Sequence, residues 1–391
     1  MLLYTLTQSL ANFLPDFLIK QRRTDVDNLE TLKQLVNIKS ISLEDNSEII
    51  NYLITKFQPY SKEILKISTP NSNSTNLLIG INTEIKNTKA IILSGHIDTV
   101  VANEQEYKTN PYFATILDNK MFGLGVIDMK CYFASIIDNL DKISKLNKPF
   151  IIAISGDEET NLNGIKEITK TLKQRNITPL VSIIGEPTSL NICTTSKGCF
   201  EYQIDINGKS CHSSNPKNGT NACYIMAKLI SFIENINLKY PNTTLNVGIS
   251  HGGKKANIVP DNASLVFDIR SNKQAYVDLI IQEIEQCFIS LKNTYQNCEI
   301  ILKQNLAIPM LEENENSPVN ILLEKFNLKK DEFIGGCEAG YFQAIGGDAF
   351  IFGAGDLALA HKPNEYLNLK NYTIYNKIFI KMLNFLDKFY K

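Results

Sequence analysis

The sequence predicts an α/β fold in which a mixed, mostly parallel sheet is flanked by helices and a smaller βαββαβ domain is inserted. Three observations support this prediction. The chain has 391 residues, which is long for one compact core. Short, strongly apolar runs are separated by segments with helical spacing, and this pattern changes between residues 197 and 308.

Four short apolar runs are typical of buried strands, and each leads to a glycine and then to acidic or histidine side chains. Uniformly apolar runs indicate a parallel or mixed sheet that is covered on both faces. Ligands of such sheets collect beyond the carboxyl ends of the strands, so we expect these side chains to share one crevice. The runs cover residues 90–95, 150–156, 181–185 and 349–353.

The segment between residues 197 and 308 predicts a separate small domain. Its strand, helix, two strands, helix and final strand follow the split βαβ pattern of a small α/β sandwich. We therefore expect a catalytic domain made of residues 1–196 and 309–391, with residues 197–308 inserted. The six expected elements are residues 200–206, 219–236, 243–249, 263–269, 275–291 and 299–302.

Composition and charge argue against several classes of protein. The formal net charge is −1 and no basic stripe is present, so we expect no nucleic-acid partner and no membrane partner. No stretch approaches the ~18 uninterrupted apolar residues of a membrane span. Residues 1–27 lack the positive start of a signal peptide and predict a short helix or tail. The eight cysteines are scattered without a C-x-x-C pair, which suits reduced thiols and a cytoplasmic location.

The histidines and carboxylates that follow the apolar runs have the composition of a metal site. Imidazole and carboxylate groups are the ligands expected for Zn²⁺, with Co²⁺ and Mn²⁺ as alternatives. The carboxylates are too many for one tetrahedral ion, whereas one His and one Glu per ion with a bridging Asp would hold two divalent metal ions. The candidates are His96, Asp128, Glu158, Glu159, Glu186 and His361.

Neighbours of these ligands have expected supporting roles. Asp98 lies two residues after His96 and is placed to receive the second ring N–H, which would orient the imidazole. Glu158 and Glu159 are adjacent just past a strand, so their side chains point in different directions. One of them can bind a metal ion while the other accepts the proton of an activated water molecule as a general base.

Several segments together resemble the motif series of the M20 metallopeptidases. The likeness runs in order from about residue 28 to the end of the chain, and within the family it is greatest to the acetylornithine deacetylases. Cys131, Asn215 and Cys337 depart from the residues that are usual at their positions. The matching segments are 93–100, 123–130, 156–160, 184–189, 211–216, 244–253, 267–270, 336–339 and 361–367.

The resemblance implies a role for each expected ligand. One metal ion would be held by His96 and Glu186, the other by Glu159 and His361, and Asp128 would bridge them. Glu158 would be the general base. The implied reaction is hydrolysis of an N-acyl amino acid, N-acetyl-L-ornithine, to ornithine and acetate, which is a step of arginine biosynthesis.

The resemblance also implies a function for the inserted domain. Residues 197–308 would form a lid that pairs with its copy in a homodimer. His212 would then reach the site of the neighbouring subunit, where its imidazole could donate a hydrogen bond to the oxyanion that forms as water adds to the amide.

Three further residues are candidates for substrate binding. Arg270 is either an ordinary arginine at the end of a strand or a bidentate clamp for the α-carboxylate of the substrate. Asn257 is either a turn residue or a support for the contact between lid and substrate. Glu338 either pairs with the distal ammonium of ornithine or supports the metal site.

Other functions stay open as alternatives. Within the same class, the chain would be a succinyl-diaminopimelate desuccinylase, an acetylcitrulline deacetylase or a dipeptidase. A metal-free binding module on the same fold belongs to a different class, and the full ligand set argues against it. A dinucleotide-binding enzyme is disfavoured, because an acid ends the first glycine pattern (residues 123–128) and no long helix can follow the second (residues 353–358).

Overall fold

The computed structural model describes residues 29–236 and 238–390. The helix or tail expected for residues 1–27 lies outside these residues. By their internal contacts, the residues form two units. Among the described residues, the first unit comprises residues 29–192, Asn320–Lys329 and residues 351–390, and the second comprises Cys193–Val319 and Lys330–Phe350. The second unit contains all of residues 197–308, for which an inserted domain is expected.

The largest sheet has eight strands, and its centre is parallel. β3 pairs in parallel with both β6 and β7, whereas β2 pairs antiparallel with both β1 and β6. This mixed sheet, flanked by helices, confirms the predicted α/β fold class. In spatial order the strands are β1 (Ser61–Ser68), β2 (Thr75–Ile81), β6 (Phe150–Ser155), β3 (Thr88–His96), β7 (Ile177–Ile184), β16 (Ala349–Ile351), β8 (Ile192–Ser196) and β15 (Lys330–Phe333).

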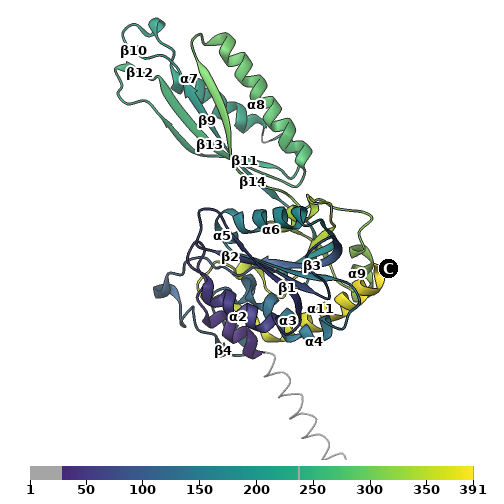
Figure 1. Cartoon of the computed structure of the whole chain (residues 1–391). Coiled ribbons are helices and arrows are strands. Elements are labelled where there is room, and N and C mark those ends of the chain that lie inside the picture. The colour runs from purple at the N-terminus through teal and green to yellow at the C-terminus, as the bar shows by residue number, and fades with distance from the viewer. Residues whose placement is uncertain (1–28, 237, 391) are drawn as a thin grey trace, which may run out of the picture. The chain divides into compact units, whose positions relative to one another are not determined.

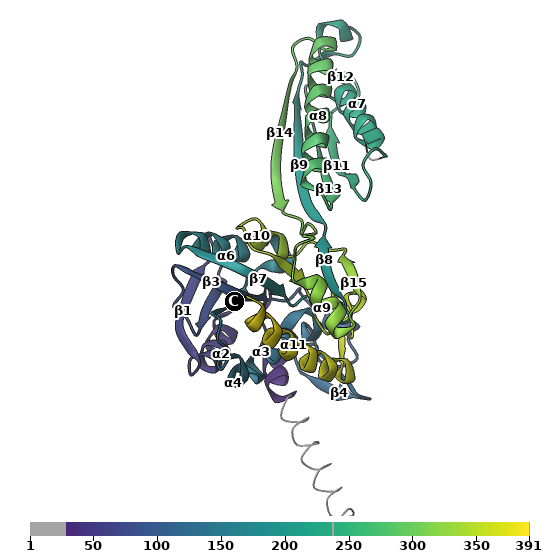
Figure 2. The same cartoon turned by 90° about the vertical axis from the view of Figure 1, so that its right-hand side faces the viewer.

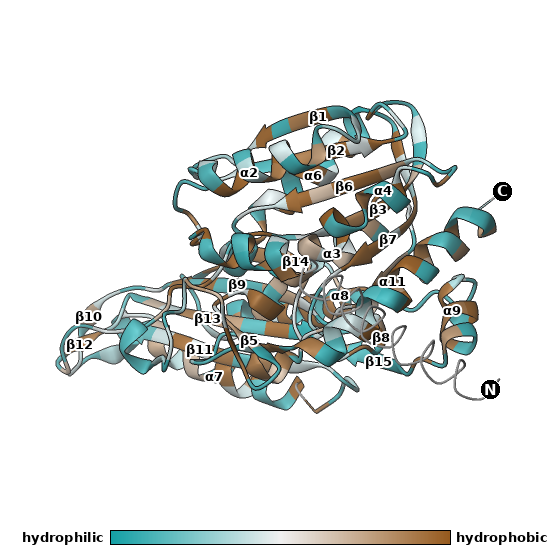
Figure 3. Ribbon diagram, turned by 90° about the horizontal axis from the view of Figure 1, so that it is seen from below, coloured by the Kyte–Doolittle hydropathy of each residue, from teal (hydrophilic) through white to brown (hydrophobic). Residues whose placement is uncertain are grey.

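Helices of the first unit cover both faces of its sheet. Figures 1 and 2 show α6 (Asn163–Gln174) on one face and α2 (Ser47–Phe57), α3 (Cys131–Asp138) and α11 (Leu369–Phe389) on the other. All residues of β6 are buried as a result, and hydrophobic residues dominate the central strands in Figure 3. This burial on both sides explains their uniformly apolar sequences. Within the described residues, no helix combines the length and hydropathy that a membrane span needs.

Shorter elements join distant parts of the first unit. β17 (Tyr366–Asn368) pairs antiparallel with β5 (Lys120–Phe122), which in turn pairs with β4 (Thr115–Leu117). This small sheet holds the residues that precede Asp128 beside the residues that follow His361. Residues 29–37 are helical. Four further α-helices of the described residues are short, namely α4 (Leu140–Ile143), α5 (Glu158–Asn161), α9 (Val319–Phe326) and α10 (Ala339–Gln343).

The second unit contains a four-stranded antiparallel sheet with two helices on one face. The apolar side of each helix is buried against the strands in one hydrophobic core. The main elements occur in the predicted strand–helix–strand–strand–helix–strand order, and a two-stranded sheet of β10 (Cys211–His212) and β12 (Ile258–Val259) was not predicted. The main elements are β9 (Gly198–Asn207), α7 (Ala222–Ile236), β11 (Thr244–Gly252), β13 (Asn262–Ser271), α8 (Gln274–Thr294) and β14 (Glu299–Ile308).

Candidate metal centre

The expected ligands follow neighbouring strands of the large sheet. His96 is the last residue of β3. Glu158 and Glu159 begin α5 just after β6, and Glu186 comes just after β7. His361 lies in the segment that follows β16. These four strands are adjacent in the order β6, β3, β7 and β16, so the sheet brings ligands that are distant in sequence to one place.

Asp128 contacts both histidines. Its Oδ1 lies 3.0 Å from Nε2 of His96, and its Oδ2 lies 3.2 Å from Nε2 of His361. Ligand atoms of His96, Asp128 and Glu186 lie within 4.8 Å of one another, and those of Asp128, Glu159 and His361 do the same. Two groups of three potential ligands therefore share one aspartate, as a carboxylate that bridges two ions requires.

Several carboxylates of the expected ligands lie close together in a buried site. The side chains of His96 and Asp128 are almost completely buried. Hydrogen bonds from His361 to the carboxylates of Asp128 and Glu159 raise the pKa of this histidine to about 10. Burial raises the pKa of Glu158, and the neighbouring carboxylate of Glu159 raises it further. Carboxylates that repel one another in a buried site are stabilised when positive charge is placed between them.

The donor set fits two divalent cations. In addition to the shared Asp128, each group has one imidazole and one glutamate that the other group lacks. These are ligands suited to Zn²⁺, Co²⁺ or Mn²⁺. The side chain of His361 is 50% exposed, whereas that of Glu159 is 7% exposed. The group that contains His361 is thus open on one side, as a catalytic metal site must be to admit water or substrate.

Asp98 contacts both His96 and the turn that carries Glu158 and Glu159. Nδ1 of His96 lies 3.0 Å from the main-chain oxygen of Asp98 and 3.6 Å from its carboxylate. The carboxylate accepts the N–H groups of Glu158 and Glu159, each at 3.2 Å, and the Ser42 hydroxyl also donates to it. The main-chain oxygen is therefore the nearer partner of the ring, and the carboxylate holds the turn that presents the two glutamates.

A buried aspartate beside this turn has a role that the sequence did not reveal. Asp157 is fully buried and has a φ of 62°, a left-handed conformation that aspartate adopts more readily than most residues. Its carboxylate accepts hydrogen bonds from the hydroxyls of Ser72 and Ser74 and from the N–H of Leu43. These partners are at least 83 positions away in the sequence. The sequence around Asp157 therefore could not show which segments its carboxylate holds.

A glycine allows the segment that leads to His361 to pass close to Glu186. A Cβ atom on Gly353 would lie 2.2 Å from the main-chain oxygen of Glu186, which no side chain tolerates. The N–H of Gly353 donates to the Thr188 hydroxyl at 3.0 Å. This close approach of two main chains brings two ligand-bearing segments together.

Three of the other expected site residues lie at different places in the second unit. His212 is exposed on β10, where its Nδ1 accepts the N–H of Ser214 at 3.2 Å. Asn257 is also exposed, and its main-chain oxygen accepts the N–H of Ser213, so it lies beside His212. Arg270 lies near the far end of β13 and donates to Asp268 at 2.8 Å. The unit therefore does not bring Arg270 to His212.

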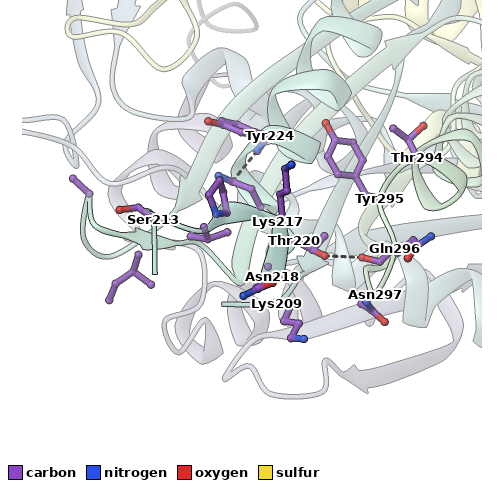
Figure 4. Close-up of a pocket in the computed structure, with 16 residues that line it drawn as sticks. Lys209, Ser213, Lys217, Asn218, Thr220, Tyr224, Thr294, Tyr295, Gln296 and Asn297 are labelled. Carbon is purple, nitrogen blue, oxygen red and sulfur yellow. Dashed lines mark hydrogen bonds between the residues drawn. The ribbon is translucent and has the colours of Figure 1, made fainter. Parts of the chain in front are cut away.

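The fourth residue, Glu338, also belongs to the second unit and is fully buried directly before α10. The second unit also has a cavity of about 720 Å³ whose lining includes Lys209, Lys217, Tyr224 and Tyr295 (Figure 4). Both residues of β12 line the cavity, but no expected site residue does.

Known proteins with similar sequences share one family. The model of peptidase family M20/M25/M40 matches residues 92–384. An acetylornithine deacetylase of Buchnera aphidicola subsp. Acyrthosiphon pisum (strain Tuc7) is 30% identical over 359 residues, covering 87% of this chain and 92% of that protein. The acetylornithine deacetylase of Pectobacterium carotovorum subsp. carotovorum (strain PC1) is 30% identical over 363 residues, covering 88% and 93%.

Solved structures share the fold at lower identity. A tripeptidase from Staphylococcus aureus subsp. aureus Mu50 matches with a TM-score of 0.75 at 22% identity, covering 93% of this chain and 99% of that chain. The Bacillus subtilis YXEP protein, a dinuclear metal binding peptidase from the M20 family, matches with a TM-score of 0.69 at 14% identity, covering 94% and 99%. With its family model matched over most of its length, the chain belongs to peptidase family M20/M25/M40 and is an amidohydrolase.

Proposed function

We propose that the chain is a two-metal amidohydrolase that removes the acyl group from the nitrogen of an amino acid. The proposed substrate is N-acetyl-L-ornithine, and the products are L-ornithine and acetate. Similarity to acetylornithine deacetylases supports this substrate and a place in arginine biosynthesis. The observation that carries the reaction class is the position of Asp128, whose two carboxylate oxygens face two different histidines.

Two divalent cations would occupy the two groups of ligands, with Zn²⁺ as the proposed ion and Co²⁺ or Mn²⁺ as alternatives. The first would be held by His96 and Glu186, the second by Glu159 and His361, and Asp128 would bridge them. When bound, such cations polarise the amide carbonyl and lower the pKa of a water molecule from its value in bulk water towards about 7.

Glu158 is the proposed general base. Its neighbour Glu159 is engaged by His361 at 2.7 Å, so Glu158 is the member of the pair whose carboxylate is available for proton transfer. Glu158 takes a proton from the attacking water, and the water oxygen bonds to the acyl carbon. The same proton then passes to the amine nitrogen as the C–N bond breaks. Asp98 keeps the carboxylate in place by holding the main-chain N–H of Glu158.

We further propose that residues 197–308 form a lid through which two chains pair as a homodimer. The edge strand β11 of the four-stranded sheet has mostly exposed residues, and an exposed edge of this kind can pair with another chain. In this proposal His212 serves the site of the neighbouring subunit and Asn257 supports it. Arg270 would exchange Asp268 for the substrate α-carboxylate, and Glu338 would pair with the distal ammonium or support the metal ligands.

Kinetics with metal-restored protein test the substrate. The protein is first stripped by a chelator and then supplied with Zn²⁺ or Co²⁺. The value of kcat/KM is measured for N-acetylornithine, N-acetylcitrulline, N-succinyl-diaminopimelate and a dipeptide. We expect the highest value for N-acetylornithine. A higher value for another compound would change the substrate and keep the reaction class, whereas no metal-dependent hydrolysis of any compound would favour a binding module.

A further inference from the structure

A buried carboxylate outside the ligand set links two segments that carry ligands. Glu365 lies four residues after His361 and is 2% exposed. Its Oε2 accepts the N–H of Gly125 at 3.1 Å, and its Oε1 accepts that of Ile127 at 2.9 Å. Its main-chain oxygen also accepts the N–H of Gly123 at 3.3 Å. Three N–H groups of one loop are therefore bonded to a single residue more than two hundred positions away.

The loop that makes these bonds leads directly into Asp128. Gly125 has a φ of 73°, a left-handed conformation that glycine adopts without steric cost. N–H groups in a buried, irregular loop need acceptors from elsewhere, because no neighbouring strand supplies them. Glu365 supplies two acceptors with its carboxylate alone, so this side chain determines the path of the main chain just before Asp128.

A strand pairing next to Glu365 adds a second connection between the same segments. Tyr366 pairs with Phe122 in the β17–β5 ladder. The ladder and the carboxylate of Glu365 thus hold residues 120–127 against the segment that begins at His361. At the end of this arrangement, Oδ2 of Asp128 lies 3.2 Å from Nε2 of His361.

We propose that Glu365 is a positioning residue that fixes Asp128 relative to His361 and thereby sets the metal affinity of the ligand group that they share. This inference rests on the proposed two-metal function. Glu365 belongs to neither group of potential metal ligands, and each of its carboxylate oxygens accepts a loop N–H. Its effect is on the orientation of ligands, and loss of such outer groups weakens metal binding by about 10- to 100-fold.

Glu365→Gln tests this role with little change in volume. The amide has one acceptor oxygen and one NH₂ donor, so one of the two loop N–H groups loses its acceptor and faces a donor. Asp387→Asn is the matched control. Asp387 is also buried in the first unit and accepts the N–H groups of Asn147 and Lys148 at 2.8 and 2.7 Å, but it holds no segment that carries a ligand.

Co²⁺ binding to the metal-free, full-length protein is measured by calorimetry, together with the visible spectrum of the bound ion and the unfolding temperature. We expect Glu365→Gln to bind at least one of two equivalents about 10- to 100-fold more weakly, with an altered spectrum. Asp387→Asn should keep the wild-type affinity and spectrum although it unfolds at a lower temperature. Glu365→Asp keeps the carboxyl group but has a shorter reach, so it should also bind more weakly, and it replaces the glutamine variant if that protein does not fold.

Wild-type Co²⁺ affinity and spectrum in a folded Glu365 variant would show that this carboxylate only stabilises the fold, and would overturn the inference. An equal loss of affinity in Asp387→Asn would overturn it as well, because the effect would then follow from lower stability. The wild-type protein separates this outcome from failure of the proposed function. If it bound no Co²⁺ at all, the two-metal proposal would fall and the inference with it.

Discussion

Nε2 of His361 lies 2.7 Å from Oε1 of Glu159, although the two residues are 202 positions apart. The carboxylate of Asp98 accepts the main-chain N–H groups of both Glu158 and Glu159, but His361 contacts the side chain of Glu159. The two neighbouring glutamates therefore have different surroundings, and they should respond differently to the same substitution.

Glu158→Gln should bind metal almost as the wild type does but lose most of its turnover. An amide cannot accept the proton of the attacking water, and loss of a general base costs a factor on the order of 10²–10⁴ in rate. Glu159→Gln should weaken metal binding itself, because it removes a carboxylate from one ligand group. Bound metal is counted by elemental analysis beside kcat. Metal loss in the Glu158 variant with retention in the Glu159 variant would reverse the two assignments.

The two ligand groups that share Asp128 should bind two cations with unequal affinity. His96 is buried, whereas the side chain of His361 is 50% exposed, so solvent competes for one group more than for the other. When protein that has been stripped of metal by a chelator is titrated with Zn²⁺, we expect activity to rise until two equivalents of Zn²⁺ per chain have been added. Full activity at one equivalent, without a second binding event, would contradict the two-metal arrangement.

Asp138 should make stability depend on pH. Burial raises its pKa from 3.8 to about 6, and its Oδ2 is buried without a hydrogen-bond partner among the described residues. Folding therefore favours the protonated form, so this contribution to stability is complete below pH ~4 and is lost as the pH rises through about 6. The uncharged amide introduced by Asp138→Asn does not titrate in this range, so the variant would not show this loss.

The measurement compares the unfolding temperature of Asp138→Asn with that of wild type at pH 4 and pH 8. The difference should shift in favour of the variant as the pH rises, by on the order of 2 °C for a protein of this size. Asp118→Asn, at an exposed position in the turn between β4 and β5, is the control and should show no such shift. A difference that is the same at both pH values would show that Asp138 titrates alike in the folded and unfolded states.

The sequence predicted the central strands well because they are buried on both faces. β6, for example, is apolar throughout and fully buried. β1 was missed, since this edge strand alternates exposed and half-buried positions and contains no apolar run. β4, β5 and β17 have three residues each, which is too short for periodicity to reveal.

The same limit applies to the site. The candidate ligands could be picked out from the sequence because each stands next to a strand end or in a distinctive motif, and the structure brings them together. The partners of Asp157 and Glu365 are main-chain N–H groups and serine hydroxyls in distant loops. A main-chain N–H has no signature in a sequence, so only the fold could show which carboxylates hold the ligand-bearing turns.

His212 is expected to act as a donor in the active site of a second chain. Its Nδ1 lies 2.8 Å from Oγ of Ser214 and 3.2 Å from the main-chain nitrogen of Ser214, so the proposed donor is Nε2, in the tautomer that carries its proton there. An exposed Nε2–H can donate to the oxyanion that forms as water adds to the amide, and one such donor contributes about 3 kcal/mol. His212→Ala should therefore lower kcat by roughly 10²- to 10³-fold while metal binding is unchanged.

Mixing of two inactive variants shows whether His212 acts within its own chain or across a dimer. His212→Ala and Glu158→Gln proteins are denatured together and refolded, and hybrids are separated by an affinity tag on one of them. In a hybrid, one site has its own Glu158 and receives an intact His212 from the partner chain, while the other site lacks both. If subunits mix at random and the sites act independently, the mixture should recover about a quarter of wild-type activity before separation, and the separated hybrids about half. Hybrids that form but stay inactive, beside wild-type protein that refolds to full activity, would mean that His212 does not serve a neighbouring subunit.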